Sequence, residues 1–333
     1  MVFSDNNNIM KKIFITLFLI LSIVSPFLLA LFSFPTLSPS TLFTDNQDSL
    51  IFFSLRLPRY TLAFFVGAAL SLAGVSFQSL LKNPLADPYI LGISGGSALG
   101  YVIAIILSAP FFLLPFAAFV SALLSLIFIY TIAKTRGSLV TINLLLTGII
   151  FNSFSFAVIL VLNAVVPFGQ SQQILYLLMG SIPPVATNQL LLIALIVVAC
   201  FVILLTRANV LNLFSLGEEE AFHLGVPVAR EKKIIFVVTS LLVGASVSLC
   251  GLIGFVGLFV PHLLRLFLGA DHKILIPASI FFGGLFLSIA EFLASHFFLF
   301  ENFQTRLPVG AITALIGAPL FVLLLKRQAR ILC

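Results

Sequence analysis

Long apolar runs alternate with short polar connections along the whole chain. A membrane-spanning helix needs roughly 20 predominantly apolar residues, and most of the runs reach about that length. The pattern therefore predicts an all-α integral membrane protein with about ten transmembrane helices. The expected spans cover residues 13–34, 60–81, 94–109, 112–133, 140–163, 189–206, 234–250, 254–268 (a short one), 274–297 and 309–326.

The composition supports this interpretation. Of the 333 residues, 61% are hydrophobic and only 8% are charged, whereas a soluble domain carries roughly 25% charged residues. So few charges cannot wet the surface of a folded soluble protein. The composition excludes a soluble enzyme, a disordered scaffold and a nucleic-acid binder, although the net charge is +6.

The positive charges orient the predicted spans. Cytoplasmic loops of membrane proteins are enriched in Lys and Arg, and ten spans with a cytoplasmic N-terminus place 14 of the 17 Lys and Arg inside. Only Arg56, Arg59 and Arg306 fall outside. Without the short 254–268 span, Lys326, Arg327 and Arg330 would lie on the wrong side. We expect a multi-pass protein of the bacterial cytoplasmic (inner) membrane with both termini cytoplasmic and an uncleaved first helix.

Two segments of similar sequence indicate an internal repeat. The segment Val66-Gly-Ala-Ala-Leu-Ser-Leu-Ala-Gly-Val75 shares six of ten positions with Val243-Gly-Ala-Ser-Val-Ser-Leu-Cys-Gly-Leu252. The two lie in spans of opposite direction, as an inverted-topology repeat requires. The alternative is that Gly, Ala and Ser recur in any packed membrane helix. We expect one transmembrane domain over 1–333, with repeat halves at about 60–163 and 234–326.

Motifs for catalysis or metal binding do not occur in the sequence. It has neither GxxxxGK[ST], the phosphate-binding loop, nor HExxH. Cys200, Cys250 and Cys333 are isolated from one another and from His, so neither a disulfide framework nor a zinc site is indicated. Glu291 is the acidic residue well inside a span, and we interpret it as a hydrogen-bonding group between helices. We expect no cofactor and no metal.

The largest polar island covers residues 207–233. Within it, Ser215 to Gly225 is expected to form one short helix with three carboxylates in its first turn, where they meet the positive end of the helix dipole. Gly225 and Pro227 stop the helix, and an apolar side formed by Leu216, Ala221 and Leu224 would need a partner to pack on. The residues of this candidate segment are Ser215, Leu216, Gly217, Glu218, Glu219, Glu220, Ala221, Leu224 and Gly225.

Several linked motifs resemble the permease subunits of ABC importers for iron–siderophores, haem and vitamin B12. The resemblance runs from about residue 54 to 327, in the same order and spacing. The motifs are Arg56-Leu-Pro-Arg59, Asn83-Pro-Leu-Ala-Asp-Pro88, the Ser215–Gly225 segment, Gly251-Leu-Ile-Gly-Phe-Val-Gly-Leu-Phe-Val-Pro-His-Leu-Leu-Arg265 and Leu307-Pro-Val-Gly-Ala-Ile-Thr-Ala-Leu-Ile-Gly-Ala-Pro319.

The resemblance implies the type II importer fold and a set of partners. These are a second permease copy, two separate ATP-binding cassette subunits that bind and hydrolyse ATP, and an extracytoplasmic substrate-binding protein. The Ser215–Gly225 segment would be the coupling element that docks into the ATPase. The cytoplasmic gate would lie at Asn83, Leu85, Thr141 and Leu145, and Asn152 belongs to the small, neutral-polar lining of the fifth span.

The resemblance also explains the arginines that break the positive-inside rule. It implies that Arg56 and Arg59 dock onto glutamates of the binding protein, and exposed Arg suits that role because its guanidinium binds carboxylates bidentately. The alternative is contact with phospholipid headgroups. The chain departs from the family at Ser295, where Arg is common, and at Arg306, where Glu is common. Arg306 is a candidate replacement contact, whereas His262 is interpreted as a structural residue.

The expected function is import of a chelated cargo by alternating access, driven by a partner's ATP hydrolysis. An iron–siderophore is the first candidate cargo, with haem and vitamin B12 as alternatives. From other classes, two alternatives remain. An ion-gradient-driven secondary transporter usually has several intramembrane ionisable groups, whereas Glu291 is a single one, and an integral membrane enzyme would need a paired acid, base or metal cluster inside the spans, which we do not find. An ABC permease for bare metal ions is a further alternative. Pairing with itself or with a sister permease stays open.

Overall fold

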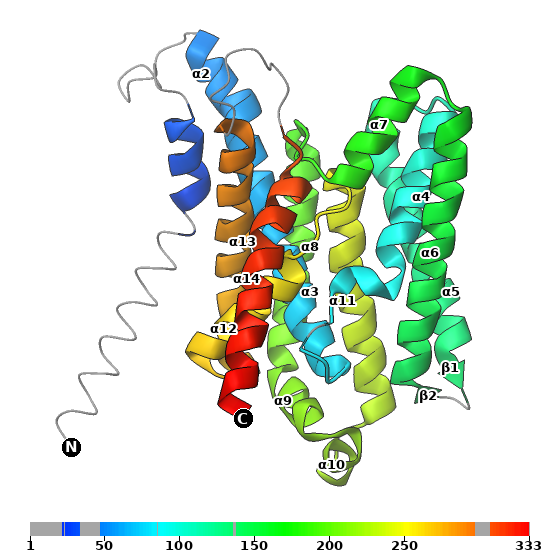
Figure 1. Cartoon of the computed structure of the whole chain (residues 1–333), viewed down its shortest axis with the longest axis vertical. Coiled ribbons are helices and arrows are strands. Elements are labelled where there is room, and N and C mark those ends of the chain that lie inside the picture. Colours follow the sequence, from blue (N-terminus) through cyan, green and yellow to red (C-terminus); the bar gives the residue numbers. More distant parts are fainter. Residues whose placement is uncertain are drawn as a thin grey trace, which may run out of the picture.

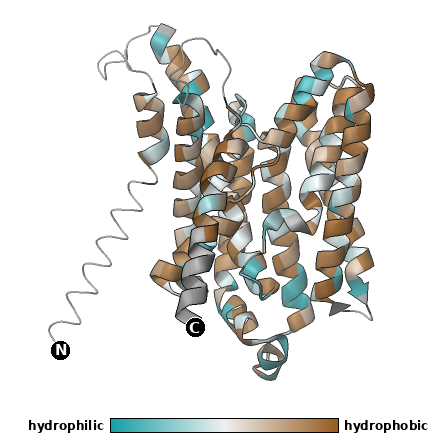
Figure 2. Cartoon of the chain, in the orientation of Figure 1, coloured by the Kyte–Doolittle hydropathy of each residue, from teal (hydrophilic) through white to brown (hydrophobic). Residues whose placement is uncertain are grey.

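The computed structural model of the chain describes residues 22, 24–33, 47–84, 86–135, 138–296 and 307–332. Within these ranges the chain forms a helical bundle (Figure 1). One antiparallel pair of two-residue strands, β1 (Lys134–Thr135) and β2 (Ser138–Leu139), connects two of the helices. Apolar residues dominate the middle of the bundle, and polar residues gather mostly toward its two ends (Figure 2).

Six helices of the described chain are long and apolar enough to cross a membrane. They confirm six of the spans expected from the sequence. The helices are α3 (Leu57–Leu80), preceded by α2 (Gln47–Ile51) and η1 (Phe52–Arg56); α5 (Leu114–Ala133), preceded by η3 (Phe111–Leu113); α6 (Thr141–Val165); α8 (Thr187–Thr206); α11 (Val228–Cys250); and α13 (His272–His296).

Three further spans correspond to helices with shorter apolar stretches: α4 (Ile93–Ile106), α12 (Val256–Leu268) and α14 (Val309–Leu332), which is apolar over 309–322. At 1.5 Å per residue, α4 and α12 are each about 20 Å long, less than the roughly 30 Å of a bilayer core. The chain before α4 forms η2 (Pro88–Leu91) and touches the chain before α12, because the Ile253 N–H donates to Tyr89 Oη at 2.9 Å. Half of the expected span at 13–34 lies outside the described residues.

The sequence analysis missed two helices between expected spans. Helix α7 (Phe168–Met179) follows α6, and α9 (Ala208–Leu216) lies within the polar island before α10 (Glu218–His223). In Figure 1, α10 marks one end of the bundle, and α2 and α7 mark the opposite end. We call these the α10 end and the α7 end.

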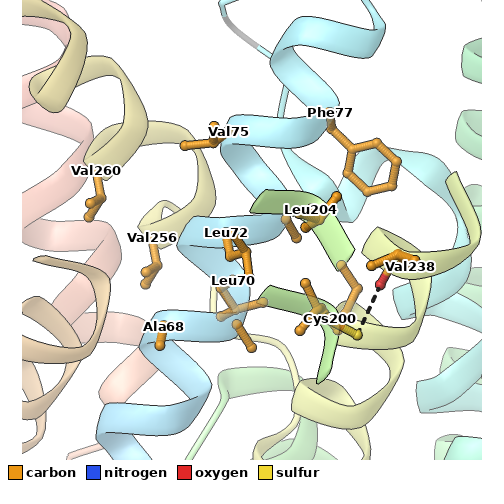
Figure 3. Packing of buried hydrophobic residues seen from close by; sticks show 14 of the residues in the cluster. Ala68, Leu70, Leu72, Val75, Phe77, Cys200, Leu204, Val238, Val256 and Val260 are labelled. Atoms are coloured by element: carbon orange, nitrogen blue, oxygen red, sulfur yellow. Dashed lines mark hydrogen bonds between the residues drawn. The ribbon is translucent and has the colours of Figure 1, made fainter. Parts of the chain in front are cut away.

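Helix α3 forms the centre of the core. Nineteen of its 24 residues are buried, and Figure 3 shows its side chains between those of α8, α11 and α12. The Cys200 thiol of α8 is buried there and donates to the Val238 carbonyl of α11 at 3.8 Å. A helix covered on all sides must be apolar all round rather than amphipathic, which is why its sequence shows no polar face.

Glycines of the repeated segments mark close helix contacts. Helices α3 and α11 run in opposite directions (Figure 1). At Gly67 of α3, an added Cβ would lie 2.2 Å from the Gly283 carbonyl oxygen of α13. At the matching Gly244 of α11, it would lie 2.9 Å from Ala122 Cβ of α5. The repeated glycine thus serves the same purpose in both segments, because a small residue lets two membrane helices approach closely.

Candidate transport pathway and partner faces

A hollow of about 420 Å³ lies between α4, α6 and the chain that precedes α12. We call it the central hollow. Its lining combines apolar groups with hydroxyl and amide groups and, among the described residues, carries no charged side chain. The lining residues are Tyr89, Ser94, Gly95, Ala98, Asn152, Ser153, Phe156, Ile159, Leu252 and Gly254.

Asn152 of α6 fastens that helix to the beginning of α4. Its Nδ2 donates to the Tyr89 carbonyl at 2.8 Å, and its Oδ1 accepts from the Gly95 N–H at 2.9 Å. The contact requires glycine, because a Cβ on Gly95 would lie 2.3 Å from Asn152 Oδ1. The structure thus places Asn152, predicted as a pathway residue, in the wall of the central hollow.

A second hollow, also of about 420 Å³, lies at the α10 end where three elements meet. We call it the coupling hollow. The end of α3, the first residue of α6 and the first turn of α10 contribute to it. Its lining residues are Leu80, Leu81, Lys82, Thr141, Glu218, Glu219 and Glu220. Residues predicted separately for the gate and for the coupling element therefore share one site.

Glu218 is bound to both α6 and α11. Thr141 Oγ1 donates to Glu218 Oε1 at 3.2 Å, and Lys232 Nζ lies 2.5 Å from Glu218 Oε2 and 3.2 Å from Thr141 Oγ1. The Lys232 side chain is only 6% exposed. A buried ammonium is costly unless it is paired, so Lys232 holds Glu218 in place. The sequence analysis did not single out Lys232, because it placed this residue in the polar island before the predicted span at 234–250, whereas α11 already begins at Val228.

The single helix expected over Ser215–Gly225 is wrong. Ser215 and Leu216 end α9, Gly217 is extended, and α10 begins at Glu218. Glycine is a poor helix former, and the Glu220 carboxylate occupies the space beside Gly217, where an added Cβ would lie 1.4 Å from Glu220 Oε2. The acidic first turn is confirmed, as is the stop at Gly225, which has a left-handed φ of 85°.

The apolar side expected for this helix is also different. Ala221 is fully buried, whereas Leu216 and Leu224 are 67% and 64% exposed. Phe222, which the sequence analysis did not single out, is 66% exposed. Three large apolar side chains beside exposed Glu219 and Glu220 form a mixed apolar and acidic surface at the α10 end, a combination typical of a protein-binding surface.

Two other predicted gate residues are close in sequence to residues that line the coupling hollow. Asn83 lies in the turn after α3, where its N–H donates to the Gln78 carbonyl at 3.0 Å and its carbonyl accepts from the Ala86 N–H at 3.1 Å. Leu145 is one turn beyond Thr141 and packs against the main core. Leu85 lies outside the described residues. The gate itself stays a prediction.

At the α7 end, Arg56 and Arg59 are half-buried and bonded within the chain. Arg56 Nη1 donates to the Ser33 carbonyl at 2.6 Å. Arg59 Nε lies 3.9 Å from Glu291 Oε1 in α13, and Ser295 Oγ donates to the same carboxylate oxygen at 3.3 Å. Glu291 thus joins α3 and α13 through an ion pair with an arginine predicted for docking, whereas the sequence analysis expected a hydrogen bond between helices.

The remaining candidates are Arg306 and His262. Arg306 lies outside the described residues. His262 is buried in α12, where its ring meets the edge of Phe321 at a centroid distance of 5.6 Å. Over the described ranges, no group of three or more His, Cys, Asp or Glu residues is arranged to hold a metal ion.

The sequence profile of the FecCD transport family matches residues 15–327. The chain belongs to the FecCD transport family. Among its relatives, the cobalamin import permease BtuC of Halobacterium salinarum is 40% identical, over 84% of this chain and 74% of the relative. The hemin transport permease HmuU of Yersinia pestis is 37% identical, over 86% of each chain.

A solved structure has the same architecture. It is the inward-facing conformation of a metal-chelate type ABC transporter, with a TM-score of 0.81, 30% identity, and coverage of 93% of this chain and 98% of that one. The chain is therefore an ABC importer permease with the type II fold and a multi-pass membrane protein. The family resemblance stated from the sequence motifs is confirmed.

Proposed function

We propose that the chain is the transmembrane permease of an ATP-driven importer that moves an iron chelate across the bacterial cytoplasmic membrane. Two identical copies form the pathway, and two separate ATP-binding cassette subunits bind at the α10 end, which faces the cytoplasm together with both termini. An extracytoplasmic binding protein delivers the cargo at the α7 end through Arg56, Arg59 and Arg306.

The observation that carries this proposal is the position of Glu218. It is the first residue of α10, yet it is bound to Thr141, the first residue of α6, and to Lys232 of α11. Helix α6 leads from Thr141 to Asn152 in the wall of the central hollow. A movement imposed on α10 therefore reaches the pathway through one carboxylate and one helix.

The surface of α10 is suited to binding a separate ATPase subunit. Exposed Leu216, Phe222 and Leu224 offer apolar area for a partner, and Glu219 and Glu220 add charge that favours one orientation of docking. The sequence lacks the phosphate-binding loop, so ATP hydrolysis is assigned to the cassette subunit. The mixed surface is then the site at which that subunit engages Glu218 and its neighbours.

The lining of the central hollow favours a cargo that passes as a complete chelate. Its wall presents amide and hydroxyl groups and apolar side chains but no acid or base, so it suits a large molecule that must pass without tight binding. Relatives are named for hemin and for cobalamin, and the similar solved structure for a metal chelate. Haem and vitamin B12 are the alternative cargoes.

The test is uptake into proteoliposomes that contain the permease with its cassette subunits, supplied with the binding protein and a radiolabelled ferric siderophore. We expect accumulation only with ATP, unaffected by an ionophore that collapses ion gradients. Haem and cobalamin are assayed in parallel, and the compound that stimulates ATP hydrolysis is identified as the cargo. Uptake by the permease alone, abolished by the ionophore, would contradict the proposal and indicate a secondary transporter.

A further inference from the structure

A second polar network at the α10 end joins α9, α13 and α3. It consists of Asn212 in α9, His272 as the first residue of α13, and Ser79 next to the last residue of α3. His272 and Ser79 are 1% and 4% exposed. His272 Nε2 is hydrogen-bonded to Ser79 Oγ, and its Nδ1 lies 2.6 Å from Asn212 Oδ1. We call these three residues the Asn212–His272–Ser79 chain.

Asp271 fixes the orientation of every group in this chain. Its Oδ1 accepts from Asn212 Nδ2 at 2.8 Å and from the Lys273 N–H at 3.0 Å, and these hydrogen bonds hold the pKa of the Asp271 carboxyl below its usual value. The Asn212 amide nitrogen therefore faces Asp271. Its oxygen faces the other way and accepts from both the N–H and the Nδ1–H of His272.

The donor and acceptor roles continue into α3. Because Nδ1 of the imidazole carries the proton, Nε2 of the neutral ring is an acceptor. It accepts a hydrogen bond from the Ser79 hydroxyl, whose oxygen also lies 3.1 Å from the Val75 carbonyl oxygen of its own helix. Ser79 also accepts from the Lys82 N–H through its carbonyl at 3.3 Å. The network thus ends at the turn that carries Lys82 and Asn83, beside the coupling hollow.

The other end of the network adjoins α10. Asn212 belongs to α9, which is separated from α10 by Gly217 alone. A displacement of α10 consequently pulls on Asn212 as well as on Glu218. These are two separate connections, because Glu218 leads to α6 and α11, whereas Asn212 leads through His272 to α3.

We propose that the Asn212–His272–Ser79 chain is a second mechanical connection, which carries movement of the α9–α10 segment to the end of α3 and the turn at Lys82 and Asn83. The proposal rests on the proposed function, because it assumes that a cassette subunit moves α10. It assigns positioning roles to three residues that touch neither ATP nor cargo.

The test compares cargo imported per ATP hydrolysed in proteoliposomes that hold the complete transporter. The variants are Ser79→Ala, Asn212→Ala and the double variant. Ser76→Ala is the matched control for Ser79, since Ser76 is also buried in α3 but bonds only to the Leu72 carbonyl of its own helix. Asn188→Ala is the control for Asn212, since Asn188 bonds only within its own turn in α8.

We expect Ser79→Ala and Asn212→Ala each to lower import per ATP by about three- to tenfold, with the double variant no worse than either single one. A purely structural defect would lower uptake and hydrolysis together and leave their ratio unchanged. Import per ATP equal to that of the controls, or multiplicative effects in the double variant, would overturn the inference. If wild type and controls show no ATP-driven uptake, the proposed function fails instead.

Discussion

Arg59 Nε of α3 lies 3.9 Å from Glu291 Oε1 of α13, and the two side chains are 19% and 7% exposed. The pair joins the central helix of the core to one of its main packing partners near the α7 end. Removing one partner of a largely buried charge pair destabilises a fold, because the other charge is left without compensation. The contact therefore has consequences for stability that are separate from any docking role of Arg59.

Replacing Glu291 with Gln leaves Arg59 without its carboxylate. Because the contact is partly exposed and not at optimal distance, we expect the free energy of unfolding to fall by about 2 kcal/mol, between the values for surface and buried pairs. The measurement is the midpoint of thermal unfolding in detergent. Glu219→Gln, on exposed α10, is the control, and an equal midpoint for both variants would refute the prediction.

Replacing Lys232 with Met removes the ammonium that holds Glu218 but keeps the aliphatic volume. We expect uptake per ATP to fall about tenfold, because α10 then loses its ion pair with α11 and is held to α6 by the Thr141 hydrogen bond without the support of the ammonium, while the cassette subunits still hydrolyse ATP. Lys233→Met is the matched control, since the Lys233 ammonium lies over the Tyr130 ring, 5.6 Å from its centroid, whereas the ion pair with Glu218 is made by Lys232. Equal coupling in the two variants would count against the role of Lys232.

Replacing Gly95 with Ala places a methyl group against Asn152 Oδ1. We expect a loss of about 1–3 kcal/mol in stability together with reduced uptake, because α4 must move away from α6 at the central hollow. Gly254 lines the same hollow with no atom within 4 Å of an added Cβ. The Gly254→Ala variant should therefore behave as wild type in both thermal unfolding and uptake.

Replacing Gly217 with Ala displaces the Glu220 carboxylate from beside the junction of α9 and α10. The backbone there is extended, with a φ of 164°, so the substitution acts through the side chain of Glu220 rather than through backbone strain. We expect ATP hydrolysis to persist while uptake falls about fivefold or more. Gly169→Ala, at an open position, is the control. Full uptake by the Gly217 variant would show that the junction is not used in coupling.

Most of the fold was predictable because a bilayer requires long apolar runs. The helices at 114–133 and 187–206 follow directly from such runs. Helix α7 was missed because Gln170 to Gln173 interrupt its apolar pattern. The break at Gly217 was missed because an extended glycine has no sequence signal that distinguishes it from a helical one.

The contacts of the site were less predictable than its elements. Glu218 and Lys232 are separated by the turn at Gly225, and a sequence does not specify the direction in which such a turn returns the chain. Arg59 and Glu291 are more than 200 residues apart, so their pairing depends on how α3 packs against α13. The motif resemblance located Thr141 and Glu218 separately, and only the fold brings them together.

Helix α3 is about 36 Å long at 1.5 Å per residue, with Arg59 near one end and Ser79 near the other. Enclosed by neighbours over nearly its whole circumference, it has little room to bend and must tilt or slide as a rod. Such a rod cannot shift at its Arg59 end without shifting at its Ser79 end. Under the proposed function, docking of the binding protein and ATP hydrolysis by the cassette subunits would both act on this one rigid helix, and no series of flexible elements would be needed to connect them.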